Sequence, residues 1–240
     1  MTTEHASANR AYSESGSWAI PDALIFDLDG LIVDTERVVF EVWTTVFEEH
    51  GCSFSEIEWS HAVGGSDSFR PLEVLQERSQ VPVGHLAALI NSVETRIEAR
   101  LEGINALPGV ASWMNNANLL GVRIGVASNS PRAWVEARLT QVGLRHLVDA
   151  MSCRDESPNS KPAPDIYLTA CSRLDVPPHL AVAVEDSMTG IAAAKAAGIQ
   201  CIAVPTAFTR HHDLSAADVI VESLASAEFV DTMKRLSSKC

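Results

Sequence analysis

The sequence contains few of the features that mark zinc-binding, redox or membrane proteins. Its cysteines are odd in number and widely spaced, without a C-x-x-C pair, so we expect free, reduced thiols at Cys52, Cys153, Cys171, Cys201 and Cys240. No apolar run approaches the ~20 residues of a membrane-spanning helix, and the N-terminus lacks a basic segment followed by an apolar stretch. We therefore expect a cytoplasmic protein that does not insert into a membrane.

Basic residues are also scarce. The chain has 18 Lys and Arg residues against 31 Asp and Glu residues, which gives a formal net charge of −13. Such a surface repels nucleic acids and anionic membranes, so neither is an expected partner. If the substrate is an anion, a bound metal ion or a lysine must reverse this field locally.

The order of the apolar segments predicts an α/β protein. A chain of 240 residues with 46% hydrophobic content can form one large domain, or a core domain with a smaller insert. Short β-prone runs alternate with helical segments, as in a doubly wound parallel sheet, at residues 23–28, 122–127, 180–184, 201–204 and 218–221. Ligands of such sheets bind beyond the carboxyl ends of the strands. Residues 1–18 have no periodic apolar pattern, and we expect a flexible extension there.

Residues 36–104 show helical periodicity without a convincing strand. The candidate core positions of this region are Leu72, Val74, Leu75, Leu86, Leu89, Ile90, Val93 and Ile97. We predict an inserted helical domain at 36–104 and an α/β catalytic core formed by 19–35 and 105–240. Two linkers would join them, so the insert could move as a hinge over the site. In the core, Ser130-Pro131 and Ser187 predict the starts of two helices.

Two acidic pairs follow predicted strands. Asp27 and Asp29 stand two residues apart just after the first strand, so their side chains point the same way. Glu185 and Asp186 follow a later strand. Carboxylates this close repel one another, and a hard divalent cation such as Mg²⁺ would relieve the repulsion. The alternatives are an ordinary Asp-x-Asp-Gly turn for the first pair and helix capping for the second.

Two further segments carry groups suited to an anionic substrate. Ser128-Asn129-Ser130 ends the second predicted strand and begins a helix, where a hydroxyl and free backbone N–H groups can receive phosphate oxygens. Lys161 stands in a loop stiffened by two prolines, so its ammonium could be held near the acids. The alternatives are a plain helix cap and a solvated surface lysine.

Along the chain these elements come in the order acid pair, hydroxyl, lysine, second acid pair. This order resembles that of the motifs in the haloacid dehalogenase superfamily. The specific motifs are the segment from Phe26 to Glu36, Lys161-Pro162-Ala163-Pro164-Asp165, and Val184-Glu185-Asp186-Ser187 followed by Gly190. The resemblance covers about residues 22–222 and is to the small-molecule phosphatase and β-phosphoglucomutase-like branch. It implies a Rossmann-like core, an inserted helical cap and a Mg²⁺ cofactor.

The resemblance also implies a role for each motif residue. Asp27 is the nucleophile that becomes an aspartyl-phosphate, and Asp29 is the acid that then acts as a base. The phosphoryl group is held by Ser128, Asn129 and Lys161. The metal ligands are Asp27, Asp29 through its carbonyl, Asp186 and Glu185.

Three functions are compatible with this resemblance: a phosphatase for a sugar phosphate or phosphoglycolate-like ester, a phosphosugar mutase, and a catalytically silent binding or regulatory protein. Asp29 argues for phosphate esters, since dehalogenating and phosphonate-cleaving relatives lack this second aspartate. Val39 stands where β-phosphoglucomutases carry a histidine. In the cap, Gly64 resembles the relatives' loop glycine, and Asp67 replaces an arginine for which Arg70 could substitute. We therefore predict a phosphatase for a small phosphorylated metabolite, as a monomer or weak homodimer.

Overall fold

The computed structural model describes residues 20–63, 70–79 and 85–238. Its centre is a six-stranded sheet with the strand order β3-β2-β1-β4-β5-β6, in which neighbouring strands are parallel. The strands are β1 (Ala23–Phe26), β2 (Arg123–Ser128), β3 (Ala150–Cys153), β4 (Ala181–Glu185), β5 (Gln200–Ala203) and β6 (Val219–Ile220). The predicted doubly wound parallel sheet is confirmed. The extension expected at 1–18 lies outside the described residues, as do Gly64, Asp67 and Cys240.

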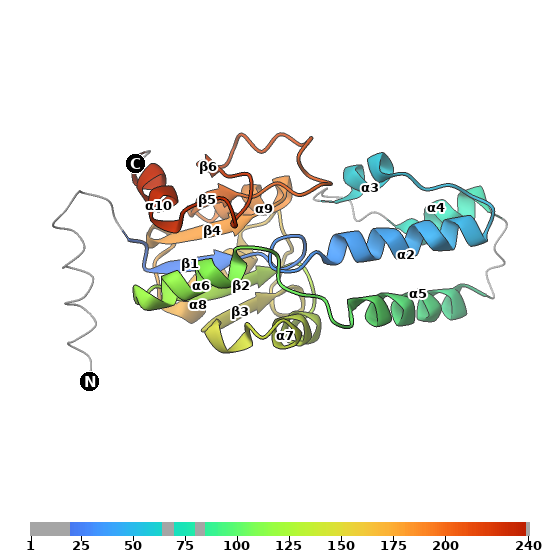
Figure 1. Ribbon diagram of the computed structural model, residues 1–240, viewed down its shortest axis with the longest axis horizontal. Helices are drawn as coiled ribbons and strands as arrows, with labels where there is room; N and C mark the ends of the chain where they lie inside the picture. Colours follow the sequence, from blue (N-terminus) through green and yellow to red (C-terminus); the bar gives the residue numbers. More distant parts are fainter. Residues whose placement is uncertain (1–19, 64–69, 80–84, 239–240) are drawn as a thin grey trace.

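Helices cover both faces of the sheet. One face carries α6 (Val110–Leu119), α7 (Arg132–Gln141) and α10 (Phe229–Ser237), and the other carries α8 (Asp165–Leu174) and α9 (Met188–Ala196). Short 3-10 turns form at η3 (Arg145–Leu147), η4 (Arg154–Glu156) and η5 (Pro178–Leu180). Beyond the carboxyl ends of the strands lie α2 (Thr35–Glu49), α3 (Glu56–Ala62), α4 (Pro71–Arg78) and α5 (Leu86–Leu101) (Figure 1).

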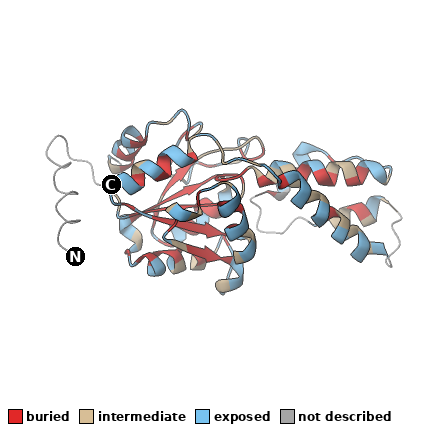
Figure 2. Cartoon of the chain, turned by 60° about the horizontal axis from the view of Figure 1, so that its bottom comes forward, coloured by how far each residue is buried: buried red, intermediate tan, exposed pale blue. Residues whose placement is uncertain are grey.

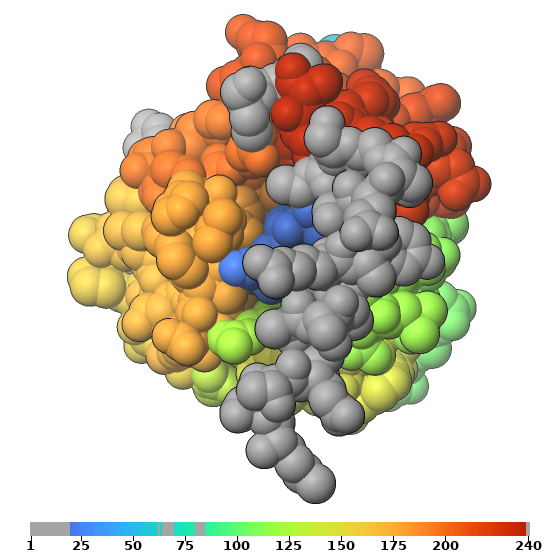
Figure 3. Space-filling view, turned by 90° about the vertical axis from the view of Figure 1, so that its left-hand side faces the viewer, coloured from blue at the N-terminus to red at the C-terminus, as the bar shows by residue number. Residues whose placement is uncertain are grey.

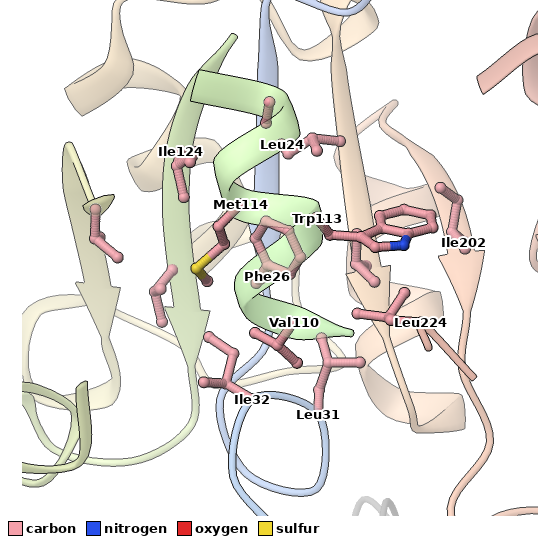
Figure 4. Close-up of a cluster of buried hydrophobic side chains, with 14 of the residues drawn as sticks. Leu24, Phe26, Leu31, Ile32, Val110, Trp113, Met114, Ile124, Ile202 and Leu224 are labelled. Atoms are coloured by element: carbon pink, nitrogen blue, oxygen red, sulfur yellow. The ribbon is translucent and has the colours of Figure 1, made fainter. Parts of the chain in front are cut away.

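The central strand β1 is apolar throughout because both of its faces are covered. Leu24 and Phe26 point into the cluster under α6, where Trp113 packs (Figure 4), whereas Ala23 and Ile25 point toward α8 and α9. This alternation follows from the pleat of a strand, which sends successive side chains to opposite faces. Most strand residues are accordingly buried, apart from Arg123 at the start of β2 and Ile220 in the edge strand β6, and the outer sides of the helices are exposed (Figure 2).

The register of the sheet decides where the motifs meet. β1 lies between β2 and β4, and Phe26 is paired with Val126 on one side and Val184 on the other. The segments that follow these three strands therefore emerge at one edge, on the side of α2 to α5. At the opposite edge the residues just before β1 (blue in Figure 3) lie beside a hollow of about 250 Å³, which Ile20 and Pro21 help to line. Among the described residues, no Asp, Glu, Lys or Arg lines that hollow.

We call α2 to α5 together the helical unit. Its apolar core is separate from those on the two faces of the sheet, and Phe208 from the loop after β5 also packs into it. In this core the rings of Phe47 and Phe54 stack with their centres 4.7 Å apart. Of the predicted core positions, Leu75 and Val93 are buried, but Ile90 is 37% exposed, so that assignment was wrong. The large aromatic side chains fill the space instead. The domain boundaries given above stay a prediction.

Two local features differ from the sequence-based expectations. β3, with the sequence Ala-Met-Ser-Cys, was not predicted, because it has no β-branched or aromatic residue. Ser130 does not cap α7, whose N-cap position is Pro131 and has no side-chain hydrogen bond. By contrast, Ser187 caps α9 as predicted, by accepting from the N–H of Gly190. Among the helices that the structure describes, none is long and apolar enough to cross a membrane.

Candidate active site

Asp27 and Asp29 leave β1 in a tight turn. The N–H of Asp27 still donates to the carbonyl of Val184, at 3.0 Å, so this residue extends the sheet pairing. Gly30 then has a φ of +84°, and a Cβ at this position would lie 2.5 Å from Asp186 Oδ2. Only glycine combines this backbone conformation with such a close approach. The turn thereby brings the first acidic pair against the second.

Lys161 is buried between the two acidic pairs. Its Nζ lies 2.5 Å from Asp27 Oδ1 and 2.5 Å from Glu185 Oε1, and it donates to the carbonyl of Ala127 at 2.9 Å. The side chain is only 4% exposed, so it is not a solvated surface lysine. Burial alone would lower the pKa of Lys161, but the carboxylates of Asp27 and Glu185 raise it above its ordinary value. The side chain is therefore an ammonium at neutral pH.

The buried carboxylate of Glu185 has hydrogen-bonding partners inside the protein. Besides the contact with Lys161, its Oε1 accepts a hydrogen bond from the hydroxyl of Tyr167 at 2.7 Å. Helix α9 packs directly against this carboxylate, since a Cβ at Gly190 would lie 2.0 Å from it. Glu185 thus forms a second ionic contact that holds Lys161 in place beside Asp27.

The carboxylate of Asp29 is surrounded by four hydrogen-bond donors. Its Oδ1 accepts from Thr35 Oγ1 at 2.7 Å and from Trp134 Nε1 at 2.9 Å, and its Oδ2 accepts from Ser130 Oγ at 2.7 Å and Ser128 Oγ at 3.3 Å. Ser130, the residue expected to cap α7, is therefore used to hold this carboxylate. Donors on both oxygens fix the orientation of the side chain.

Asn129 joins the end of β2 to the loop of Lys161. Its side-chain oxygen accepts from the N–H of Lys161 at 2.9 Å, and its amide nitrogen donates to the carbonyl of Lys161 at 3.3 Å. Beside it, Ser128 Oγ accepts from the N–H of Ser130 at 3.0 Å. The Asn129 side chain therefore positions the lysine loop, a role that its place in the sequence did not indicate.

Three carboxylates form a buried group that could bind a metal ion. Asp27, Glu185 and Asp186 each offer an oxygen, and these oxygens lie within 4.8 Å of one another. Burial, together with the neighbouring carboxylates, raises the pKa of Asp186 well above its ordinary value. Burial likewise raises the pKa of Asp27 to about 7, although Lys161 opposes the shift. A divalent cation would relieve this repulsion.

The chemistry of the donor set fits a hard cation. Within the described ranges no side chain or backbone N–H donates to the Asp186 carboxylate, so its oxygens are available as ligands. The Asp29 carboxylate is not part of this group, and four donors already occupy its oxygens. Glu185 belongs to the group by distance, but one of its oxygens is occupied by Lys161 and Tyr167.

Asp27, Asp29, Lys161 and Asp186 line a cavity of about 290 Å³ between the sheet edge and the helical unit, whereas Glu185 does not. From the helical unit, the lining includes Thr35, Glu36, Val39, Trp59 and Val63. Burial, with the charges of Asp29 and Asp27, raises the pKa of Glu36 to about 8. The cavity is therefore lined by acidic side chains and Lys161, together with the apolar side chains of Val39, Trp59 and Val63.

Of the two predicted cap contacts, Arg70 lies within the described residues, and it is not part of this lining. Arg70 pairs with Glu73 on its own helix at 2.8 Å, and its side chain is 66% exposed. It does not line the cavity, so the expectation that it contacts the substrate has no support from its position. Gly64 lies outside the described residues.

Comparison with known proteins identifies the family. A model described as haloacid dehalogenase-like hydrolase matches residues 24–204. The chain belongs to this family. The resemblance found in the motifs is therefore confirmed, and the protein is a hydrolase of the haloacid dehalogenase type.

This hydrolase is similar along most of its length to several known proteins. YhcW of Bacillus subtilis is 38% identical over 90% of this chain and 98% of its own. The fructose-1-phosphate phosphatase YqaB of Escherichia coli is 33% identical over 75% of this chain and 95% of its own. The crystal structure of CbbY from Rhodobacter sphaeroides in complex with phosphate superposes with a TM-score of 0.72, at 30% identity, and covers 86% of this chain and 96% of that one.

Three polar partners in the site of this hydrolase were not predicted. Thr35, Trp134 and Tyr167 bond the Asp29 and Glu185 carboxylates, yet each stands in a helix whose pattern explains it as a core or first-turn residue. The only sequence signal is for Thr35, which lies within the segment from Phe26 to Glu36 that carries the family resemblance.

Proposed function

We propose that this hydrolase is a Mg²⁺-dependent phosphatase of a small phosphorylated metabolite, acting through an aspartyl-phosphate on Asp27. The observation that carries the proposal is the buried ammonium of Lys161, 2.5 Å from Asp27, with the free carboxylate of Asp186 close by. Phosphoryl transfer requires compensation of the charge on the phosphoryl oxygens and in-line placement of a nucleophile. A buried lysine and a group of carboxylates that could bind a metal ion meet the first requirement, and Asp27 beside them is the candidate nucleophile.

Asp27 and Asp186 are the side chains that would hold Mg²⁺, with the backbone carbonyl of Asp29 as a further ligand. The bound ion supplies positive charge that offsets the carboxylates and the transferring phosphoryl group. Lys161 supplies a second positive charge from the protein itself. Ser128 and the backbone of Asn129 would receive the phosphoryl oxygens at the end of β2.

Asp29 is proposed as the group that moves protons. A carboxylate oxygen of Asp27 attacks phosphorus, the bond from phosphorus to the leaving oxygen breaks, and protonated Asp29 gives its proton to that oxygen. Asp29 then removes a proton from the water that attacks phosphorus, which releases inorganic phosphate and restores Asp27. Dividing hydrolysis into two displacements lets one carboxylate act as nucleophile and the other as acid and base.

The substrate class follows from the cavity and from one relative. A cavity of about 290 Å³ accommodates a small metabolite, and the similar protein YqaB is named a fructose-1-phosphate phosphatase. A sugar phosphate or a phosphoglycolate-like ester is the proposed substrate. The helical unit is proposed as a cap, whose closure over the site would exclude bulk water and contact the leaving group.

A mutase is the less favoured alternative because of Val39. This residue lines the cavity, and valine can neither donate nor accept a hydrogen bond. A mutase must protect its phospho-aspartate from water while the sugar reorients, so a polar gating group is expected there. With Val39 in the wall, we expect water to hydrolyse the Asp27 phosphate.

The test is a panel of phosphorylated metabolites assayed for phosphate release with Mg²⁺ and with EDTA. Fructose 1-phosphate, phosphoglycolate and β-glucose 1-phosphate with a trace of the 1,6-bisphosphate are the informative members. We expect Mg²⁺-dependent release of phosphate from at least one. Formation of glucose 6-phosphate faster than phosphate would identify a mutase, and no turnover of any member would support a catalytically silent protein.

A further inference from the structure

Helix α7 connects the Asp29 carboxylate to the helical unit through two side chains. Trp134 and Arg138 stand one helical turn apart, so they lie on the same face of α7. The indole N–H of Trp134 donates to Asp29 Oδ1 at 2.9 Å. On the other side, the guanidinium carbon of Arg138 lies 4.7 Å from the centre of the Trp134 ring, within the range of a cation–π contact.

Arg138 continues this connection into α5. Its NH2 group lies 2.7 Å from Glu98 Oε2, and its side chain is 7% exposed, whereas that of Glu98 is 54% exposed. Arg138 Nε has no hydrogen-bond partner among the described residues, so Glu98 and the indole ring are what hold the guanidinium. A second contact joins the same helices, since Gln141 donates to the carbonyl of Leu101. In Figure 1 the C-terminal end of α5 approaches α7.

We propose that Trp134 is a positioning residue for Asp29, and that the series Trp134, Arg138 and Glu98 links the placement of α5 to the orientation of that carboxylate. This inference rests on the proposed function, in which Asp29 exchanges a proton with the leaving oxygen.

The hydrogen bonds around Asp29 explain why Trp134 matters. Oδ1 is held by Thr35 and Trp134 at 2.7 and 2.9 Å, while the longest of the four bonds, 3.3 Å, joins Oδ2 to Ser128. With Oδ1 anchored, Oδ2 faces Ser130 at 2.7 Å and Ser128 at 3.3 Å, and Ser128 is part of the proposed phosphoryl site. A proton-transfer group must be held within a fraction of an ångström of its productive position. An indole packed against a guanidinium is a rigid donor for this purpose.

The test uses two substrates that differ in their need for a proton. An alkoxide leaving from a sugar phosphate must be protonated, whereas 4-nitrophenolate is stable enough to leave without an acid. General acid catalysis contributes ~10²- to 10⁴-fold, so partial misplacement of Asp29 in Trp134→Phe should lower kcat/KM for the best sugar phosphate of the panel by ~10-fold or more. For 4-nitrophenyl phosphate the expected loss is under ~3-fold by the same reasoning.

A second variant tests the link to α5. Glu98→Gln weakens the pair with Arg138 at a half-exposed position and should produce the same preference for the aryl substrate, with a smaller loss of ~3-fold. The matched control is Glu49→Gln, which removes a contact of 2.9 Å between Glu49 and Arg96 within the helical unit. It should leave the ratio of the two kcat/KM values unchanged. In the Trp134→Phe background, Glu98→Gln should have no further effect.

The outcomes separate this inference from the proposed function. Equal losses on both substrates in Trp134→Phe would mean that the residue only supports the fold, and would overturn the positioning role. A Glu98→Gln protein that behaves like Glu49→Gln would overturn the link to α5. This comparison can be made even if Trp134→Phe does not fold. An inactive wild-type protein would instead contradict the proposed phosphatase.

Discussion

Replacing Lys161 by methionine should strongly destabilise the metal-free protein at pH 8. Methionine keeps the length of the side chain but removes the ammonium that lies 2.5 Å from both Asp27 and Glu185. Removing one partner of a buried ion pair leaves an uncompensated charge and costs about 3–5 kcal/mol. This is a large fraction of the ~5–15 kcal/mol by which a folded domain is stable. The variant should also lose several orders of magnitude in turnover.

The destabilisation should depend on pH. The pKa of Asp27 is raised to about 7 even with Lys161 in place, and loss of the cation raises it further. A carboxylate with a folded pKa above its unfolded value destabilises the protein as pH rises, because the folded state resists ionisation. At pH 5 Asp27 is protonated in the folded forms of both proteins, so the difference between them should be smaller there than at pH 8.

Urea unfolding followed by circular dichroism, in EDTA at pH 5 and pH 8, measures this effect. The control is Lys195→Met, because Lys195 pairs with Asp218 at 2.6 Å but is 37% exposed. An exposed pair contributes only ~0–1 kcal/mol, so the control should lose little at either pH. If Lys161→Met were within ~1 kcal/mol of wild type at pH 8, against the cost expected for a broken buried pair, the reasoning would be refuted.

Three further predictions concern the other carboxylates. Asp27→Asn should fold but show no turnover and form no acid-stable phosphoenzyme, since an amide is not a nucleophile toward phosphorus; more than a few per cent of wild-type phosphate release would contradict this. Asp186→Asn should raise the Mg²⁺ concentration for half-maximal activity by ~10-fold or more, because it removes an anionic ligand, and a Mg²⁺ titration measures it. Glu36, whose pKa is raised to about 8, destabilises the protein when it ionises. Glu36→Gln should therefore stabilise the metal-free protein by about 1–3 kcal/mol at pH 9 and leave it unchanged at pH 4, which urea unfolding at the two pH values tests.

The strands that the sequence predicts well are those that are buried on both faces. Residues 23–26 of the predicted run 23–28, and residues 180–184, are continuously apolar, and β1 and β4 form within or beside them. β3 escaped prediction because a strand of four small or flexible residues has no such signal, and its pairing with β2 is a long-range contact. The aromatic core of the helical unit was also missed, because helical periodicity alone does not say which face of each helix meets its neighbour.

The sequence predicted those site residues that come directly at the carboxyl end of a predicted strand. Asp27, Ser128 and Asp186 each lie at or just beyond the carboxyl end of a strand, so parallel pairing alone brings them to one edge. Lys161 stands on a loop, and its motif suggested a place near the acids. Its burial between Asp27 and Glu185 became visible only in the structure.

By itself, the sequence determined the α/β class, the order of the motifs and the family, because short apolar runs and motif residues are local properties of the chain. Only the tertiary structure decided the contacts of the Asp29 carboxylate. Trp134 and Ser130 lie about a hundred residues away in sequence, and they reach Asp29 because β1 and β2 are paired in one register and α7 packs beside them. A hydrogen bond of that kind requires two distant segments to be placed to within a few tenths of an ångström, and no local pattern of residues specifies that placement.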